Sequence, residues 1–283
     1  MKTILITGIN GFLGSKLAKA LSTRYNIIGL EYSMENLFRL SKCNYKLYAA
    51  RDGIPETMFT EQHIDIVVHT ATYYGKNNED FNQMFYANLF SPFNLLDESI
   101  NQGCQLFINT DTVLDRFVST YALTKRQFQE WLYLRKNEIK VINMQLEHFY
   151  GPGASPTNFI TSMIQVLKNN EPQIDLTLGE QLRDFVYIDD VVNAYLAVIG
   201  KQHLISDPYS SFQVCTNQLI SIKELMNLLK DLTKSSSILN FGAIPYRETE
   251  LMHSQTDNTA LRGIGWKPSC TISEGLKYTL LNS

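Results

Sequence analysis

A tyrosine and a lysine four residues apart could carry acid–base chemistry in this chain. Tyr121-Ala-Leu-Thr-Lys125 falls in a stretch expected to be helical, so both side chains would lie on one face. A phenol releases its proton near pH ~10, and a neighbouring ammonium group favours the phenolate and brings that proton transfer toward neutral pH. The same spacing also arises where a lysine merely extends along a packed helix. The pair predicts catalysis only together with a binding site.

A second candidate group is the hydroxyl of Thr110, which directly follows the expected strand 106–109. Ligands of open α/β sheets bind outside the carboxyl ends of the strands. A hydroxyl at that place could hydrogen-bond a carbonyl or hydroxyl group of a substrate. The alternative is a threonine that only caps the strand end.

Three glycines near the start of the chain predict a dinucleotide site. Gly8-Ile-Asn-Gly11-Phe-Leu-Gly14 follows an expected apolar strand and opens an expected amphipathic helix. Gly8 and Gly11 would let the backbone turn toward a pyrophosphate, and Gly14 would let the helix approach the strand. The N–H groups at the helix start favour an anion. An ordinary turn could produce the same glycines outside this context.

Two acidic residues bear on the choice of dinucleotide. Glu31 ends the second expected strand, where a carboxylate can bond the ribose 2′-hydroxyl of NAD and would repel the 2′-phosphate of NADP. A solvated acid at a strand end is the alternative, and Arg39 lies only a turn or two further along. We therefore expect an NAD(P)H cofactor, and Glu31 favours NAD(H) over NADP(H). Asp52, after the third strand, could flank the adenine or belong to a surface turn.

Composition excludes several classes of protein. The chain has 25 Lys+Arg and 28 Asp+Glu in 283 residues, a net charge of −3, so we expect no nucleic-acid partner. It contains no apolar run of about 18 residues and begins without a signal-peptide pattern, so we expect no membrane partner. The four cysteines are widely spaced, which predicts reduced thiols and a cytoplasmic protein. No cluster of His, Cys, Asp or Glu residues has the spacing of metal ligands, so we expect no metal.

The elements that must position these groups alternate over the first 150 residues. This alternation predicts an α/β fold, a Rossmann-type doubly wound parallel sheet with helices on both faces. The expected strands are 2–7, 26–30, 64–69 and 106–109, and the expected helices are 12–24, 82–99 and 121–136.

Beyond Gly151-Pro-Gly153 the pattern changes to a smaller α+β substrate lobe. We expect helices at 159–167, 191–198, 222–230 and from 271, a strand at 185–188, and a turn over 261–268. The expected dinucleotide-binding domain is 1–150 with about 184–205. The expected substrate lobe is 151–183 with 206–283.

With these motifs in order, the chain resembles the extended short-chain dehydrogenase/reductases, the NAD-dependent epimerase/dehydratase family, which act on nucleotide sugars. Within that family it is most similar to the CDP-3,6-dideoxyhexose (paratose and abequose) synthases, which reduce a 4-keto sugar. The residues that carry the resemblance are Thr7–Gly14, His69-Thr-Ala-Thr72, Asn88, Thr110, Tyr121-x-x-x-Lys125, Gln145–Gly153, Gly179-Glu-Gln-x-Arg-Asp-Phe185 continuing to Asp190, and Phe241-Gly-Ala-Ile with Arg247 and Glu250-Leu-Met252.

The resemblance implies roles for individual residues. Tyr121 would donate the proton, Lys125 would tune it and bind the nicotinamide ribose, and Thr110 would hold the sugar oxygen. It implies cofactor contacts from Gly8, Asn10, Gly11, Phe12, Leu13, Gly14, Glu31, Asp52, His69, Ala71, Asn88, Tyr121 and Lys125. It implies substrate contacts from Thr72, Thr110, Asp111, Thr112, His148, Asn158, Arg183, Arg247 and Glu250, with the two arginines on the diphosphate.

Departures from the family pattern narrow the expected reaction. Dehydratases carry Asp-Glu directly after the catalytic threonine, whereas this chain has Asp111-Thr112, so the C5 base is absent. The bifunctional epimerase-reductases carry a cysteine at the position of Thr112. The short span from Thr110 to Tyr121 is similar to the paratose synthase group. His148 replaces an asparagine found in many relatives and could bond the sugar or a phosphate, or be packed in the core.

The expected activity is NAD(P)H-dependent reduction of the 4-keto group of a nucleotide-diphosphate sugar. The sugar would be a 6-deoxy or 3,6-dideoxy hexulose, CDP-linked by preference, made for a surface polysaccharide such as O-antigen. One alternative is a nucleotide-sugar 4-epimerase with tightly bound NAD. Another is a non-catalytic dinucleotide sensor, which would not need the hydroxyl, phenol and amine. The resemblance also implies a homodimer through helices 82–99 and 121–136.

Overall fold

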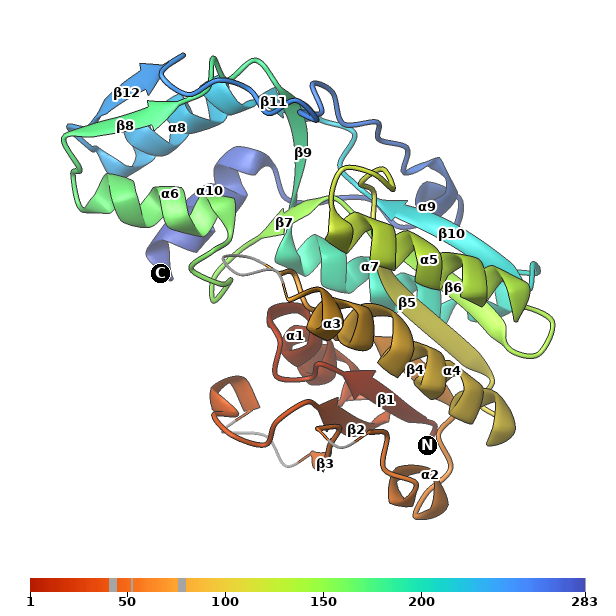
Figure 1. Ribbon diagram of the computed structural model, residues 1–283. Helices are drawn as coiled ribbons and strands as arrows, with labels where there is room; N and C mark the ends of the chain where they lie inside the picture. Colours follow the sequence, from red (N-terminus) through yellow and green to blue (C-terminus); the bar gives the residue numbers. More distant parts are fainter. Residues whose placement is uncertain (41–44, 52, 76–79, 283) are drawn as a thin grey trace. The chain divides into compact units, whose positions relative to one another are not determined.

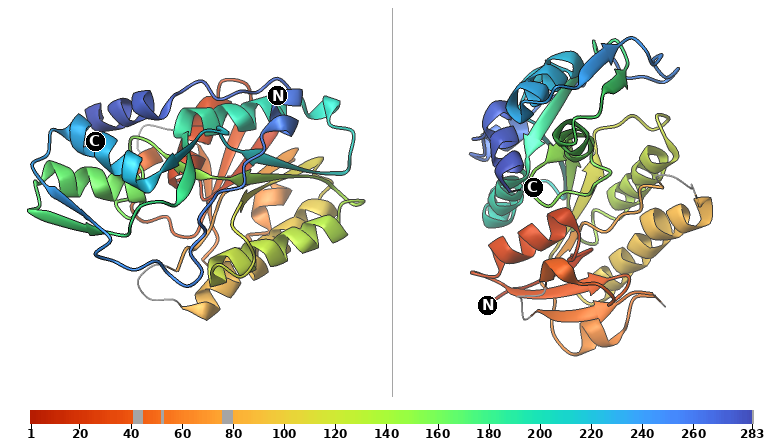
Figure 2. Two further views of the ribbon diagram at one scale, coloured as in Figure 1. Left: turned by 90° about the horizontal axis from the view of Figure 1, so that it is seen from above. Right: turned by 90° about the vertical axis from the view of Figure 1, so that its left-hand side faces the viewer.

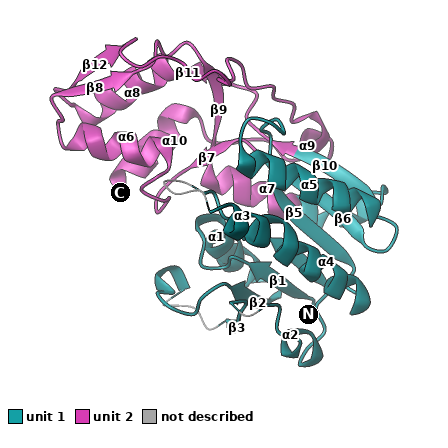
Figure 3. Cartoon of the chain, in the orientation of Figure 1, with its two compact units in different colours: residues 1–145, 198–212 teal, residues 146–197, 213–283 magenta. Residues whose placement is uncertain are grey.

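The chain forms two compact units (Figure 3). The structure, a computed structural model, describes residues 1–40, 45–51, 53–75 and 80–282. Unit 1 comprises residues 1–145 and 198–212, and unit 2 comprises residues 146–197 and 213–283. Each unit is described by itself below.

Unit 1 is built on a seven-stranded sheet in the order β10-β6-β5-β4-β1-β2-β3. The pairs of β1 with β2, β1 with β4, β2 with β3, and β4 with β5 are all parallel. Because β1 lies between β2 and β4, the chain reverses its direction of winding there, which is where open α/β sheets bind ligands. The strands are β1 Thr3–Thr7, β2 Asn26–Glu31, β3 Lys46–Ala49, β4 Ile66–His69, β5 Leu106–Thr112, β6 Lys140–Leu146 and β10 Tyr209–Val214.

Helices cover both faces of this sheet (Figures 1 and 2). Helix α1 lies on one face, and α4 and α5 lie together on the other. Apolar side chains of α4 and α5, including Leu95, Leu96, Phe128 and Leu132, are buried against β4 and β5 in one core. The helical segments are α1 Phe12–Leu21, η1 Phe38–Leu40, α2 Thr57–Thr60, α3 Phe81–Phe85, the π-helical turn η2 Tyr86–Phe90, α4 Ser91–Asn101, α5 Thr120–Leu134 and η3 Gln202–Leu204.

Unit 2 contains a three-stranded sheet in the order β11-β9-β7 and a two-stranded sheet of β12 and β8. Helices α8 and α10 each begin with a capping box, in which a Ser or Thr side chain and a Glu three residues later satisfy the free N–H groups. The elements are β7 His148–Tyr150, α6 Phe159–Lys168, β8 Gln173–Leu176, β9 Leu182–Tyr187, α7 Ile188–Gly200, β11 Leu219–Ser221, α8 Ile222–Thr233, β12 Ile238–Phe241, α9 Thr259–Gly263 and α10 Ile272–Leu281.

The observed elements confirm the expected doubly wound fold, with several local differences. Strands β6 and β10 of the large sheet were not among the expected elements, and the expected strand 185–188 ends at Tyr187, because Ile188 begins α7. β5 continues to Thr112, so Thr110 lies inside the strand rather than after it. The expected single helix over 82–99 consists of α3, η2 and α4, because a π-helical turn interrupts the helical hydrogen bonding. The segment expected to be a turn over 261–268 includes the end of α9, whose Leu261 is fully buried.

The observed division of the chain also differs from the expected one. Residues 184–197 group with unit 2, because β9 pairs with β7 and β11 and runs directly into α7. Residues 206–212 group with unit 1, because β10 extends its large sheet. Within the described part of the chain, no helix has the length and apolar character needed to cross a membrane.

Candidate active site

The glycine loop between β1 and α1 can be formed only by residues without a Cβ atom. Gly8 has a φ of +62°, and a Cβ there would lie 2.8 Å from Cα of Ala71. The N–H of Gly11 donates to the Gly8 carbonyl at 2.8 Å. A Cβ on Gly14 would lie 2.2 Å from the same carbonyl oxygen. The three glycines therefore make one tight turn against the segment that follows β4.

This turn leaves a helix start suited to a phosphate. Helix α1 begins at Phe12, and its N-cap residue Gly11 supplies no side chain to cap it. Amide N–H groups at such a start, together with the helix dipole, favour a pyrophosphate. Leu13 turns its side chain into the core, so it contributes its backbone to the turn. The loop thus fits a bound dinucleotide, which would supply hydride chemistry.

The carboxylate of Glu31 lies beside the loop. It accepts hydrogen bonds from the N–H of Asn10 at 2.9 Å and of Tyr32 at 3.2 Å. Arg39 reaches the same loop, because its backbone N–H donates to Asn10 Oδ1 and its guanidinium donates to the Asn10 carbonyl, both at 3.2 Å. The sequence placed Arg39 a turn or two beyond Glu31, and the fold brings it to Asn10. Asp52 lies outside the described residues.

His69, at the end of β4, is buried and held in one tautomer. The Thr7 hydroxyl accepts from the N–H groups of Thr70 and Ala71, both at 3.1 Å. Its own proton is therefore left for His69 Nδ1, which lies 2.8 Å away, so Nε2 carries the ring hydrogen. Burial and the nearby charge of Lys125 hold the pKa of His69 well below its usual range. The imidazole is neutral.

Asn88, in the π-helical turn, joins the segment after β4 to helix α5. Its Oδ1 accepts from the Thr72 hydroxyl at 3.1 Å and from the Tyr73 N–H at 2.8 Å. Its Nδ2 donates to the Tyr73 carbonyl at 2.8 Å and to the Thr124 hydroxyl at 3.2 Å. The amide is buried and uses its hydrogen-bonding capacity within the protein. Any effect of Asn88 on a ligand would pass through these neighbours.

The tyrosine and the lysine lie at the start of α5. Tyr121 is partly buried and its ring lies 5.0 Å from that of Tyr74, centroid to centroid. Lys125 is 2% exposed. Burial lowers the pKa of Lys125, and the charge of Asp111 opposes that shift. The buried ammonium is therefore stabilised by a carboxylate on the neighbouring strand.

Asp111 owes its position to a buried chain of polar side chains. Its Oδ2 accepts from Asn143 Nδ2 at 2.8 Å, and its Oδ1 accepts from the Thr112 N–H at 2.8 Å. Asn109 Nδ2 donates in turn to Asn143 Oδ1 at 2.7 Å. Burial raises the pKa of Asp111, while Lys125 and these hydrogen bonds act to lower it. Thr110 is partly buried between Asn109 and Asp111, and the Thr112 hydroxyl accepts from the Leu114 N–H at 3.2 Å.

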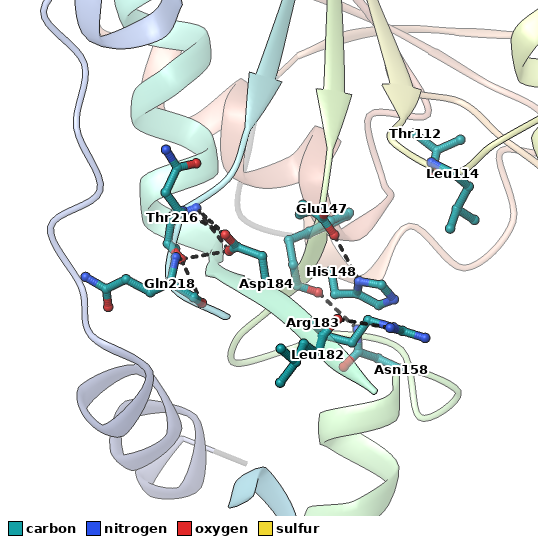
Figure 4. Close-up of polar contacts among 12 residues, drawn as sticks. Thr112, Leu114, Glu147, His148, Asn158, Leu182, Arg183, Asp184, Thr216 and Gln218 are labelled. Atoms are coloured by element: carbon teal, nitrogen blue, oxygen red, sulfur yellow. Dashed lines mark hydrogen bonds and ion pairs between the residues drawn. The ribbon is translucent and has the colours of Figure 1, made fainter. Parts of the chain in front are cut away.

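Unit 2 holds the remaining candidate residues, and Arg183 is their centre (Figure 4). Its guanidinium donates to the Leu182 carbonyl at 3.0 Å. It also donates to Glu250 Oε1 at 2.6 Å. Arg247 is exposed, and its carbonyl accepts from the Glu250 N–H at 3.0 Å. Asn158 caps α6 and donates to the Phe149 carbonyl at 3.1 Å. Glu250 thus joins the Arg183 side chain to the backbone turn that contains Arg247.

Several residues of the site were not among the predicted ones. They are Arg39, Tyr74, Asn143 and Glu147. Asn143 lies inside an apolar strand, where a buried amide is unusual and is a usable signal. Glu147 directly precedes His148, and its carboxylate accepts from His148 Nδ1 at 3.2 Å. Among the described residues, no three His, Cys, Asp or Glu side chains gather in a group that could hold a metal ion.

Comparison with known proteins places the chain in a protein family. The model of the NAD dependent epimerase/dehydratase family matches residues 4–210. CDP-abequose synthase of Salmonella typhimurium is 31% identical and is covered over 97% of its length by 98% of this chain. Human dTDP-D-glucose 4,6-dehydratase is 28% identical, with 99% of this chain and 89% of the relative covered.

Solved structures share the fold. UDP-glucuronic acid 4-epimerase from Bacillus cereus, in complex with UDP-glucuronic acid and NAD, superposes with a TM-score of 0.86 at 23% identity, covering 99% of this chain and 98% of that one. UDP-glucose 4-epimerase from Thermotoga maritima, with UDP-glucose, gives 0.85 at 23% identity over 99% and 98%. The family match agrees with the glycine loop and the Tyr–Lys pair. The chain is an NAD(P)-dependent oxidoreductase and belongs to the NAD dependent epimerase/dehydratase family.

Proposed function

We propose that this enzyme reduces the 4-keto group of a nucleotide-linked 6-deoxy or 3,6-dideoxy hexulose with NAD(P)H. The observation that carries the proposal is the buried Lys125, one helical turn from Tyr121 on α5, where the charge of Asp111 opposes the effect of burial on the pKa of Lys125. NAD(P)H held by the glycine loop would supply the hydride for the carbonyl carbon. Tyr121 donates a proton to the carbonyl oxygen, and Thr110 orients that oxygen with its hydroxyl. The ammonium of Lys125 stabilises the phenolate that remains.

The position after Asp111 favours reduction over dehydration. Dehydration needs a carboxylate base for the C5 proton, and this chain has Thr112 where that base would stand. The Thr112 side chain is buried and its hydroxyl accepts from the Leu114 N–H. The Thr112 hydroxyl therefore stabilises the backbone turn after β5, and it is not a base that could take a proton from C5 of a sugar.

The arginines of unit 2 support a nucleotide-diphosphate substrate. Guanidinium groups bind phosphate oxygens with two parallel donors. Glu250 holds Arg183 at 2.6 Å, which fixes that fork, while Arg247 is exposed. A CDP-linked sugar is favoured by the similarity to CDP-abequose synthase, and a surface-polysaccharide precursor such as O-antigen is the product class that this implies.

The direct test incubates the protein with a CDP-4-keto-3,6-dideoxy sugar and NADH or NADPH in separate reactions. We expect stoichiometric oxidation of the cofactor, with NADH preferred because the carboxylate of Glu31, beside the loop, would bond a ribose 2′-hydroxyl and repel a 2′-phosphate. No oxidation with CDP-, TDP-, GDP- or UDP-linked 4-keto sugars would contradict the proposal. Interconversion of 4-epimers by protein that retains NAD would instead support a 4-epimerase.

We further propose a homodimer in the cytoplasm. Phe81, Phe85 and Phe90 of α3 and η2 and Trp131 of α5 are 62%, 53%, 47% and 42% exposed, an apolar set suited to a second copy. Burial raises the pKa of Cys104 and of Cys215 to about 12, so these thiols stay protonated. Free thiols support a reducing compartment.

A further inference from the structure

Glu147 is a buried carboxylate that the proposed chemistry does not use. Its side chain is 1% exposed, and its Oε1 has no hydrogen-bond partner among the described residues. Its backbone N–H donates to the Val214 carbonyl at 3.3 Å, which holds the residue against that strand. A carboxylate in such a place is costly for stability. Its presence points to a role other than holding the fold together.

The group that Glu147 holds is the imidazole of His148 (Figure 4). Glu147 Oε2 lies 3.2 Å from His148 Nδ1. Because an ionised carboxylate only accepts hydrogen bonds, Nδ1 carries the ring hydrogen. In the neutral form of the ring, the lone pair then lies on Nε2. The ring also packs against Phe185, with 5.6 Å between centroids, and keeps 41% of its side chain exposed.

The surroundings of His148 favour a hydroxyl ligand over a phosphate. His148 pairs with Phe185 in the β7–β9 ladder, so Arg183, two residues earlier, projects from the same face. Glu147 bonds the ring, and the guanidinium of Arg183 bonds Glu250. Asp184 points the other way, to Thr216. Arg183 is the cationic group that the proposed function assigns to the diphosphate. The lone pair on Nε2 can accept a hydrogen bond from a donor such as a hydroxyl group, whereas a phosphate oxygen offers no proton.

We propose that Glu147 is a positioning residue that orients His148, so that Nε2 accepts a hydrogen bond from a hydroxyl of the substrate's sugar. The inference rests on the proposed nucleotide-sugar function. It assigns the His148 position to the sugar and leaves the diphosphate to Arg183 and Arg247. Glu147 itself contacts no ligand.

Calorimetric binding of CDP and of CDP-glucose to wild type and Glu147→Leu tests this arrangement. We expect the affinity for CDP-glucose to fall roughly tenfold, the effect of one lost hydrogen bond, while CDP binding stays within about twofold. The melting temperature should stay level or rise, because the variant removes a buried charge. Glu171→Leu, at an exposed glutamate of the same unit, is the matched control and should leave all three unchanged.

A double-mutant cycle separates positioning from a merely structural role. In a His148→Ala background, Glu147→Leu should weaken CDP-glucose binding no further, since Glu147 acts through the ring. If the losses of binding free energy in the two single variants instead added fully in the double variant, the inference would be overturned. His148→Gln keeps an acceptor and should bind better than His148→Lys, which can only donate; the reverse order would assign the position to phosphate.

The two proposals fail in different ways. If wild-type protein binds neither CDP-glucose nor UDP-, GDP- or TDP-linked sugars, the nucleotide-sugar function falls and this inference falls with it. If wild type binds a nucleotide sugar and Glu147→Leu binds it equally well, only the inference falls. If Glu147→Leu weakens the binding of CDP and of CDP-glucose to the same extent, Glu147 and His148 do not act on the sugar, and the inference is overturned.

Discussion

Three buried titratable side chains, on α5, β5 and β4, show how burial affects the charges of neighbouring groups. Lys125, Asp111 and His69 are all buried in unit 1. Burial lowers the pKa of His69 and of Lys125 and raises the pKa of Asp111. The charges of Lys125 and Asp111 oppose these shifts in each other, whereas the charge of Lys125 adds to the lowering of the His69 pKa. The pair therefore limits the cost of burial for both of its members and disfavours a second positive charge on the imidazole.

Asp111→Asn tests this distribution in the reaction. The variant removes the carboxylate that opposes the desolvation of Lys125, so the pKa of Lys125 falls further below its usual value. The basic limb of the pH–kcat profile should move to lower pH by about one unit or more. Asp115→Asn, at an exposed aspartate of the following loop, is the control and should keep the wild-type profile. A basic limb unmoved in Asp111→Asn would show that Asp111 does not support the charge of Lys125.

His69 makes a prediction about stability alone. Its pKa in the folded protein lies well below the unfolded value, so between the two values only the unfolded chain binds the proton. Stability is full above the unfolded value of about 6.5 and declines as pH falls, by about 1.4 kcal/mol per pH unit for one proton. His69→Gln should remove that part of the slope in urea unfolding between about pH 6.5 and about pH 5.

The exposed His63 provides the comparison. His63→Gln is the matched control, because it makes the same substitution at a histidine whose side chain is 60% exposed, and it should unfold with the wild-type pH dependence. Equal slopes in wild type and His69→Gln would mean that His69 becomes charged without unfolding.

Among the elements, the β1–α1 turn is the most tightly determined. A Cβ on Gly14 would lie 2.2 Å from the Gly8 carbonyl oxygen, a backbone atom that no rotamer change can move aside. Gly14→Ala should therefore push α1 away from β1, lower the free energy of unfolding by roughly 1–3 kcal/mol and weaken dinucleotide binding.

Gly200, at the end of α7, is the matched control, because a Cβ there meets nothing within 4 Å. Gly200→Ala should leave dinucleotide affinity unchanged and stability within about 0.5 kcal/mol of wild type. Thermal unfolding with and without NAD measures both effects. Wild-type NAD affinity in Gly14→Ala would exclude close packing of this turn as a requirement for binding.

At the scale of the whole molecule, the site residues are divided between the units. The glycine loop, Asp111, Tyr121 and Lys125 belong to unit 1, whereas His148, Arg183 and Arg247 belong to unit 2. The proposed function therefore assigns hydride and proton chemistry to residues of unit 1 and recognition of the nucleotide sugar to residues of unit 2.

The proposed dimer is also a property of the whole molecule. Phe90→Asp places a charge in the exposed aromatic set of α3, η2 and α5 and should convert dimers to monomers in sedimentation experiments, because an unpaired charge is costly in an apolar interface. Phe117→Asp, at a residue 79% exposed outside that set, should leave the mass unchanged. If the wild-type protein sediments as a monomer, the proposed dimer is wrong.

Local patterns were enough to predict the main elements and the dinucleotide loop. Apolar strands, the 3.6-residue helical repeat and glycine spacing act over a few residues, so a sequence displays them directly. The end of β5 and the π-helical turn were missed, because polar residues such as Thr110 and Asn88 reveal their place only through partners elsewhere. The same holds for Arg39, which reaches Asn10 across 29 positions.

The sequence by itself determined the chemistry that this protein can offer: a phenol with an ammonium one helical turn away, a hydroxyl near a strand end, and a turn that admits a pyrophosphate. Only the tertiary structure decided which groups are buried and what each faces. Asn143 supports Asp111 from 32 positions away, and Glu147 turns inward to hold His148. The physical reason is that desolvation and charge pairing depend on distances in space, which neighbours along the chain do not set.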